Sequence, residues 1–237
     1  MKVKSVHSAE FVKRPNRFLG QVLLNDEIVD VFIPNPGRMY ELMIPGKEVF
    51  IREANPQGRK TNFNMIAVKH EGIIVSIDSY LPNRFMKELL KRREFPRFSG
   101  YTDVRSEPPV YEGRFDFFLD GPETKVYIEV KSCTLVNERH AIFPDAPTSR
   151  GARHVRNLAR SLDDGIVDRA SVIFVVQRPD VDVFSPNDFT DPQFGSVLRK
   201  SHDRGVEVYA LRTEVVDWNL ESRGEIPVDL DYFSNQR

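Results

Sequence analysis

Residues 114 to 131 read Arg114-Phe-Asp-Phe-Phe-Leu-Asp-Gly-Pro-Glu-Thr-Lys-Val-Tyr-Ile-Glu-Val-Lys131. Two runs of alternating apolar and polar residues flank Gly121-Pro122-Glu123-Thr124, which has the composition of a tight turn. The pattern predicts an antiparallel hairpin in which the numbers of facing residues sum to 245. One face of this hairpin is then apolar and holds three pairs: Phe115 with Val130, Phe117 with Ile128, and Leu119 with Val126.

The other face of the predicted hairpin sets Asp116 against Glu129 and Arg114 against Lys131. Facing residues of an antiparallel pair have Cβ atoms about 5 Å apart, so two acids placed there repel each other. A divalent cation between them reverses the sign of that interaction. We therefore predict a metal site formed by Asp116 and Glu129, with the main-chain carbonyl of Val130 as a further ligand. Carboxylate and carbonyl oxygens suit Mg²⁺ or Mn²⁺.

A metal held in this way polarises a phosphodiester and lowers the pKa of a bound water. Lys131 lies on the same face as Glu129, and we expect it to orient or help deprotonate that water, or to stabilise the pentacovalent state. The predicted catalytic residues are thus Asp116, Glu129 and Lys131. The alternative is a structural cluster in which Arg114 and Lys131 simply neutralise the two acids.

The composition is that of a folded globular protein, with 237 residues, 40% hydrophobic and 29% charged. The single cysteine, Cys133, excludes an internal disulfide and a cysteine-based zinc cluster. The apolar runs are too short to span a bilayer, and the segment that begins at Met1 has no apolar core typical of a secretory signal. We therefore expect a cytoplasmic protein without a membrane partner.

The first third of the chain is predicted to form a small β-barrel. Roughly five strands fall within about 80 residues, and they cover residues 11–24, 27–33, 47–52, 62–69 and 72–78. Residues 1–100 carry a net charge of +6 and residues 101–237 a net charge of −7. A basic five-stranded barrel is often an oligonucleotide-binding (OB) fold. The candidate contacts are Lys13, Arg14, Arg17, Phe18, Arg38, Tyr40, Arg52, Arg59 and Lys60. The alternative for each is a core residue or a solvated surface residue.

The rest of the chain is predicted to form a mixed sheet flanked by helices. Strand–helix–strand succession implies parallel neighbours, with buried strands at 171–177 and 206–212. The expected helices begin at Asn83 as N-cap, at Thr148 or Ser149, and at Asp191-Pro192. Residues 213–237 are expected to be a short polar appendage.

The expected helix after Thr148 has an apolar stripe and a basic face. The basic face carries Arg150, Arg153, Arg156 and Arg160, and His154 lies on its flank. We predict that these five residues contact phosphates. The alternative is an ordinary solvated face, with His154 as a surface or hydrogen-bonding histidine.

The hairpin resembles the core of the PD-(D/E)xK nuclease superfamily, with Asp116 as the first motif and Glu129-Val-Lys131 as the second. A departure is Phe115, which stands where the superfamily often has proline. Nearly the whole chain resembles the sugar fermentation stimulation protein family. The residues that carry this resemblance are Asn16-Arg-Phe-Leu19, Pro34-Asn-Pro-Gly37, Asn83-Arg84, Lys87-Glu88, Ser99-Gly-Tyr101, Phe115-Asp-Phe117, Tyr127-Ile-Glu-Val-Lys-Ser132, Phe143-Pro-Asp-Ala146 and Thr148-Ser-Arg-Gly-Ala-Arg-His154.

The resemblance implies an OB-like nucleic-acid-binding domain over residues 1–82 and a restriction-endonuclease-like domain over residues 83–237. It also implies DNA binding and a link to the regulation of sugar (maltose) metabolism. Related nucleases draw a further metal ligand from the helix before the hairpin, which makes Glu88 a candidate. Two functions follow: a Mg²⁺- or Mn²⁺-dependent nuclease, or a non-catalytic DNA-binding regulator that uses the nuclease fold as a scaffold. RNA as the partner and a homodimer as the assembly are left open.

Overall fold

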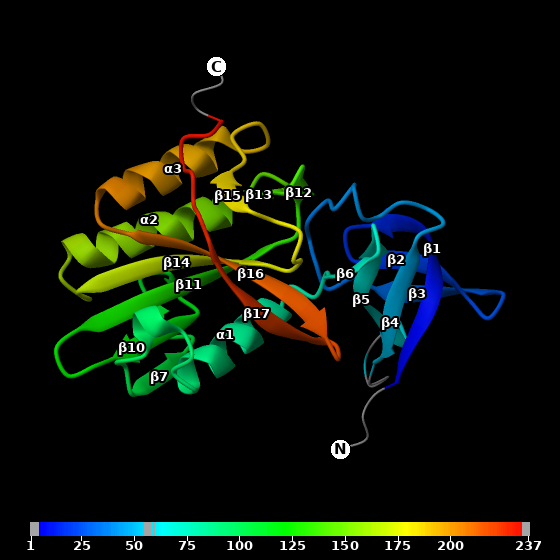
Figure 1. Ribbon diagram of the computed structural model, residues 1–237, viewed down its shortest axis with the longest axis horizontal. Coiled ribbons are helices and arrows are strands. Elements are labelled where there is room, and N and C mark those ends of the chain that lie inside the picture. The colour runs from blue at the N-terminus through cyan, green and yellow to red at the C-terminus, as the bar shows by residue number, and fades with distance from the viewer. Residues whose placement is uncertain (1–4, 55–57, 59, 234–237) are drawn as a thin grey trace.

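The computed structural model describes residues 5–54, 58 and 60–233. Arg59, a candidate nucleic-acid contact, lies outside these ranges. So do residues 1–4, where the segment compared with a secretory signal begins. The described chain forms a β-barrel and a larger sheet with helices on both faces, and the two lie side by side (Figure 1). The predicted architecture, a small five-stranded barrel followed by a mixed sheet flanked by helices, is confirmed.

The barrel is built from six strands, of which five close the ring. They are β1 (Val6–Asn16), β2 (Leu19–Leu24), β3 (Glu27–Phe32), β4 (Glu48–Glu53), β5 (Phe63–His70) and β6 (Ile73–Ser76). The order is β3-β2-β1-β4-β5-β6, and a short parallel pairing of β3 with β5 closes the barrel. The predicted strand over residues 11–24 is in fact two strands, because the Asn16 side chain accepts hydrogen bonds from the Phe18 and Leu19 amides and makes a turn.

The second sheet has the order β17-β16-β14-β11-β10-β7. Its strands are β7 (Asp103–Ser106), β10 (Phe117–Asp120), β11 (Lys125–Cys133), β14 (Arg169–Val176), β16 (Glu207–Val216) and β17 (Asn219–Ile226). The central strands β11, β14 and β16 are parallel, as the strand–helix–strand order predicts. Shorter strands lie beside this sheet: β8 (Pro109–Val110), β9 (Gly113–Arg114), β12 (Val136–Asn137), β13 (His140–Phe143) and β15 (Val183–Pro186).

Helices cover the two faces of the second sheet. One face packs on α2 (Ser149–Asp163) and α3 (Pro192–Asp203), and the other on α1 (Leu81–Lys91) and the short helix η1 (Pro96–Phe98) (Figure 1). The central strand β14 shows the consequence. Val172 and Phe174 belong to the core under α2, while Ile173 and Val175 belong to the core under α1. Burial on both faces explains why this strand has no alternation in sequence.

Two helix starts match their predictions and one does not. Thr148 caps α2 by accepting from the Gly151 amide, and Asp191 caps α3 by accepting from the Phe194 amide. Asn83 is not an N-cap, because α1 already begins at Leu81-Pro82 and Tyr80 takes the cap position. Proline suits the first turn of a helix, since its missing N–H has no intrahelical partner there.

The predicted polar appendage after residue 212 is wrong. Residues up to Val216 extend β16, and β17 pairs with it as the edge strand of the sheet. The turn between them carries Trp218, whose ring lies 4.9 Å from that of Phe50 on the barrel. Another contact between the two parts is polar, since Asp145 Oδ2 accepts from the Met39 amide at 2.8 Å. These contacts fix the barrel beside the second sheet.

No helix among the described residues has the length and apolar character needed to cross a membrane.

Candidate functional site

The hairpin of β10 and β11 has the predicted register along its regular part. Phe117 faces Ile128 and Leu119 faces Val126, so the facing numbers sum to 245. The pattern breaks one residue earlier, at Asp116. Its amide donates to the Ile128 carbonyl at 3.2 Å, but its side chain turns back and Oδ2 accepts from the Val130 amide at 2.7 Å.

This break makes two predicted pairs wrong. Phe115 does not face Val130; it lies in the core under α2, with its ring 5.0 Å from Tyr127, whereas Phe117 lies in the opposite core. In an unbroken strand these two phenylalanines would share a face. Arg114 does not face Lys131 either, because it pairs with Pro109 in a separate two-stranded ribbon and donates to Glu107.

Asp116 is a buried carboxylate held by two donors. Besides the Val130 amide, Asn83 Nδ2 donates to Oδ1 at 2.6 Å. Burial and the negative charge of Glu129 raise the pKa of Asp116 to about 6, and the two hydrogen bonds offset only part of that effect. From sequence, Asn83 is predicted only as a helix cap. Its presence in the Asn83-Arg84 pattern of the family is the signal that could have indicated its contact with Asp116.

Glu129 lies on the face of β11 that α2 covers. Lys131 Nζ and His154 Nδ1 each lie 2.5 Å from its Oε1 atom. Burial alone would raise the pKa of Glu129, but the charge of Lys131 and the His154 hydrogen bond outweigh burial and lower it. Its other oxygen, Oε2, is buried and has no hydrogen-bond partner within residues 5–54, 58 and 60–233. A buried carboxylate oxygen without a donor favours a cation as its missing partner.

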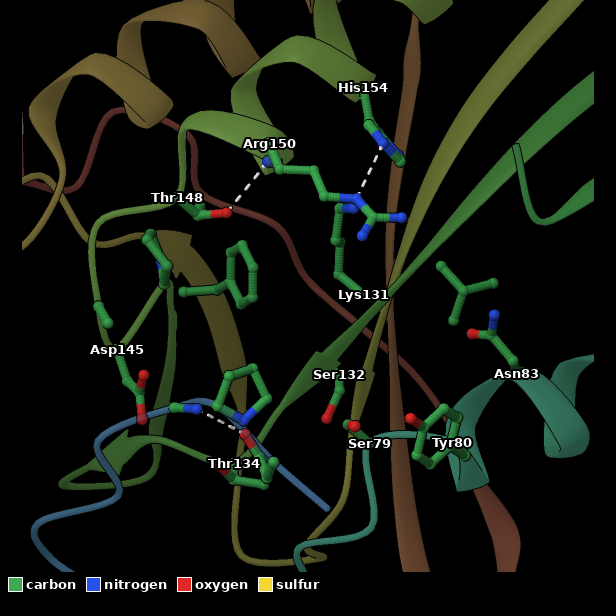
Figure 2. A pocket seen from close by; sticks show the side chains of 18 of the residues that line it. Ser79, Tyr80, Asn83, Lys131, Ser132, Thr134, Asp145, Thr148, Arg150 and His154 are labelled. Carbon is green, nitrogen blue, oxygen red and sulfur yellow. Dashed lines mark hydrogen bonds between the residues drawn. The ribbon is translucent and has the colours of Figure 1, made fainter. Parts of the chain in front are cut away.

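His154 therefore has a different role from the predicted phosphate contact. Its side chain is buried between α2 and the sheet, and it binds Glu129 instead of facing solvent. The sequence placed it on the flank of the basic face, and that flank of α2 turns toward β11 in the interior of the sheet. Its neighbour Arg150 donates from Nε to His154 Nε2 at 3.4 Å (Figure 2).

The arginines of α2 divide into two groups. Arg150, Arg153 and Arg156 are exposed. Arg160 is engaged, because it forms an ion pair with Asp164 at 3.2 Å and its guanidinium lies 4.1 Å from the centre of the Tyr111 ring. The phosphate contact predicted for Arg160 would require breaking both interactions.

The barrel candidates divide in the same way. Arg14 donates to the carbonyls of four residues, Arg17, Asn35, Gly37 and Arg38, so its guanidinium holds the barrel loops together and is not free for phosphate. Arg17 and Phe18 line a cleft together with Asp116, Glu129 and Lys131. Arg38 and Tyr40 are exposed outside the lining of this cleft.

Glu88 is not brought to the site. Its side chain is 62% exposed, forms an ion pair with Arg92 at 3.9 Å, and lines a separate cavity between α1 and β17. The apolar face of α1 packs on the hairpin, but the residue that reaches Asp116 lies at the start of the helix. The residue that α1 contributes to the site is therefore Asn83, an amide and not an acid.

The cleft lies between the barrel and the second sheet and has a volume of about 940 Å³. Figure 2 shows Ser79, Tyr80 and Asn83 along one side of it, Thr148 and Arg150 along another, and Lys131 and Ser132 between them. The walls come from the turn after β1, the start of α1, β11 and the start of α2. The cleft thus depends on how the two parts of the chain dock.

The donor set suits a hard divalent cation with several waters. Among residues 5–54, 58 and 60–233, no three His, Cys, Asp or Glu side chains form a group able to hold a metal. Asp116 and Glu129 supply two carboxylates, and Mg²⁺ is commonly held by one or two carboxylates with waters in the remaining positions. The residues present therefore fit such an ion.

Comparison with known proteins agrees with the two-part fold. Residues 12–77 match the SfsA N-terminal OB domain, and residues 80–219 match the sugar fermentation stimulation protein RE domain. The fold and the paired acids define a two-part protein, an OB domain joined to a restriction-endonuclease-like domain. The chain belongs to the sugar fermentation stimulation protein family.

Relatives match along nearly the whole chain. The sugar fermentation stimulation protein homolog of Desulforamulus reducens is 43% identical over 94% of this chain and 92% of the relative. The homolog of Acetivibrio thermocellus is 42% identical over 93% of this chain and 95% of the relative. Among solved structures, Pyrococcus furiosus SfsA in complex with Ca²⁺ superposes with a TM-score of 0.87 at 30% identity and covers 97% of this chain and 98% of that one.

Proposed function

We propose that this protein is a Mg²⁺- or Mn²⁺-dependent phosphodiesterase that cleaves nucleic acid, with DNA as the expected substrate. The observation that carries this proposal is Glu129 Oε2, a buried carboxylate oxygen that no described residue hydrogen-bonds, in a cleft shared with Asp116 and Lys131. The Ca²⁺ in the structure of Pyrococcus furiosus SfsA supports divalent metal binding in the family.

Asp116, Glu129 and the main-chain carbonyl of Val130 would hold the metal. When bound, the metal would polarise a phosphodiester oxygen and lower the pKa of a coordinated water. Lys131 is the only residue of the proposed catalytic set that can supply positive charge, and a cation beside the reacting phosphate stabilises the charge that develops there. Asn83 and His154 orient Asp116 and Glu129 by direct hydrogen bonds.

Arg17, Arg150, Arg153 and Arg156 are the proposed phosphate contacts. All four are exposed, and Arg17 and Arg150 line the cleft. Each cation that neutralises a phosphate adds to the salt dependence of binding. We therefore expect affinity for DNA to fall steeply as salt is raised, and binding without salt dependence would contradict these contacts.

The test is cleavage of labelled DNA and RNA, single-stranded and duplex, in chelator, Ca²⁺, Mg²⁺ or Mn²⁺. We expect Mg²⁺ or Mn²⁺ to permit nicking, and Asp116→Ala or Lys131→Ala to abolish it without weakening binding. The controls are Asp203→Ala and Lys200→Ala, two exposed residues of α3. Equal nicking by the wild type and both site variants would rule out this nuclease site.

The second candidate is a DNA-binding regulator that keeps the nuclease fold as a scaffold. Its support is that Lys131 and His154 already pair with Glu129 Oε1, as a structural cluster would require. Salt-dependent DNA binding with no nicking in any metal would favour this candidate.

A further inference from the structure

Two aromatic side chains line the cleft and remain open to solvent. Phe18, on the turn between β1 and β2, is 46% exposed, and Tyr80, at the N-cap of α1, is 67% exposed. Exposed apolar side chains that gather at a groove are a feature of ligand-binding surfaces. The function proposed above uses neither ring.

Phe18 is positioned by main-chain hydrogen bonds and by a ring contact. Its amide donates to Asn16 Oδ1 at 2.9 Å, and its carbonyl accepts from the Ile33 amide at 2.9 Å. Its ring stacks on Phe32, with centroids 6.1 Å apart and planes inclined by 19°. Phe32 also lines the cleft. A ring backed by a second, nearly parallel ring is a preformed platform for a further planar group.

Tyr80 stands next to the acids. Its amide donates to Asp78 Oδ1 at 2.9 Å, which fixes the start of α1. Asn83, three positions further along the chain, donates to Asp116 Oδ1. Residues three apart share a side of a helix, so a group lying on Tyr80 is close to the carboxylates. Figure 2 shows Tyr80 and Asn83 on the same side of the pocket.

We propose that the cleft takes a single strand of nucleic acid, with bases stacked on Phe18 and Tyr80 while a phosphodiester faces Asp116 and Glu129. This inference rests on the proposed function for the chemical class of the ligand. Inside a duplex both faces of each base are covered by neighbouring base pairs, so only an unpaired base can lie against these rings. Stacking on aromatic side chains is the usual mode of single-strand binding by OB folds.

The size of the cleft leads to the same conclusion. Its volume of about 940 Å³ lies within the range of small-molecule pockets, about 300–1,000 Å³. A few unpaired nucleotides fit in a space of this volume. Arg17, beside Phe18, and Arg150, at the start of α2, line the same cleft and supply charge for the backbone.

The experiment is fluorescence anisotropy of a labelled oligothymidylate and of the same strand annealed to its complement, both in chelator so that cleavage cannot occur. We expect the wild type to bind the single strand more tightly than the duplex. Phe18→Ala and Tyr80→Ala should each weaken single-strand binding by about 5- to 150-fold, the range for loss of one stacked base, and leave duplex binding unchanged. An oligouridylate of equal length shows whether the cleft prefers DNA or RNA. Weaker binding of either single strand by the two alanine variants supports the proposal.

The matched control is Phe189→Ala, since Phe189 is 71% exposed but does not line the cleft. Phe18→Trp and Tyr80→Phe keep a stacking surface and should retain affinity, which separates stacking from misfolding. Equal binding of single strand and duplex, or unchanged affinity in both alanine variants, would overturn the proposal. Because binding is measured without metal, the absence of cleavage would overturn the proposed nuclease function but not single-strand binding. Cleavage of duplex DNA that neither alanine variant affects would overturn single-strand binding but not the nuclease function.

Discussion

His154 Nδ1 lies 2.5 Å from Glu129 Oε1, although the two residues are 25 positions apart in the chain. The pKa of Glu129 lies below its ordinary value through its contacts with Lys131 and His154, so the carboxylate is the acceptor and the imidazole donates. Arg150 donates to the opposite ring nitrogen, which requires the same tautomer. One helix thus orients a carboxylate on the neighbouring strand.

Replacing His154 should weaken metal binding. Partners that orient a ligand typically contribute about 10- to 100-fold in affinity, so we expect a loss of that size for Mn²⁺ in His154→Ala, measured by calorimetric titration. His154→Asn keeps a donor on a shorter side chain and should lose less. The control is Arg153→Ala, an exposed neighbour on the same helix. An equal loss in the control would contradict the role of His154.

Asp116 should make stability fall as pH rises. Burial and Glu129 raise its pKa from 3.8 to about 6, so the folded protein binds more protons than the unfolded chain between these values. The free energy of unfolding therefore decreases as pH rises through this window. Asparagine does not titrate, so the free energy of unfolding of Asp116→Asn, relative to that of the wild type, should rise by at most about 3 kcal/mol between pH 4 and pH 7.

Urea unfolding in chelator at several pH values checks this prediction, with the exposed Asp203→Asn as the control. A constant difference between Asp116→Asn and the wild type across the window would show that the carboxyl titrates normally.

Asn83→Ala should move the pH dependence of metal binding to higher pH. The Asn83 amide favours the charged form of Asp116, and its loss raises the pKa of that carboxyl further. A metal must displace the proton, so Mn²⁺ affinity falls as pH is lowered. The pH below which this fall begins should rise by about one unit in Asn83→Ala. Titrations between pH 5 and pH 8 measure this shift.

The control for Asn83 is Glu88→Ala. Glu88 is exposed and paired with Arg92, so its removal should leave the Mn²⁺ affinity unchanged at every pH. A loss of affinity in Glu88→Ala would mean that α1 supplies a ligand after all.

Gly37→Ala should disturb the docking of the barrel. A Cβ at position 37 would lie 2.8 Å and 2.9 Å from the two carboxylate oxygens of Asp145, and Oδ2 of that residue is already bonded to the Met39 amide. We expect a loss of about 1–3 kcal/mol in the free energy of unfolding, as for a buried amide left without its acceptor. Gly100→Ala is the matched control, since no atom of the part of the chain that the structure describes lies within 4 Å of its added Cβ. Equal stability of the two variants in urea would contradict the contact.

The hairpin shows how far local sequence reaches. Alternation predicted the register of Phe117 with Ile128 correctly, because side chains in a strand alternate between two faces. The same rule extended to Phe115 is wrong, because Asp116 leaves the ladder to accept from the Val130 amide. Alternation carries no signal for such a break, which an interaction outside the strand stabilises.

Local chemistry determined much of the rest. The buried strand β14, the caps Thr148 and Asp191, and the succession of strands and helices follow from periodicity, hydrogen-bonding side chains and chain direction. The paired acids and Lys131 could also be found, since they lie within one hairpin. The role of residues 213–226 could not, because an edge strand with one polar face reads like a loop.

Only the tertiary structure decided which side chains join Asp116 and Glu129. Asn83 and His154 reach them from helices 33 and 25 positions away in sequence, while Glu88 on the same helix as Asn83 turns to solvent. Asp145 binds the Met39 amide 106 positions away, and that contact helps to set the cleft between the two parts of the chain. The physical reason is that hydrogen bonding and alternation act between near neighbours, whereas the direction in which a helix presents its polar residues depends on how its apolar face packs.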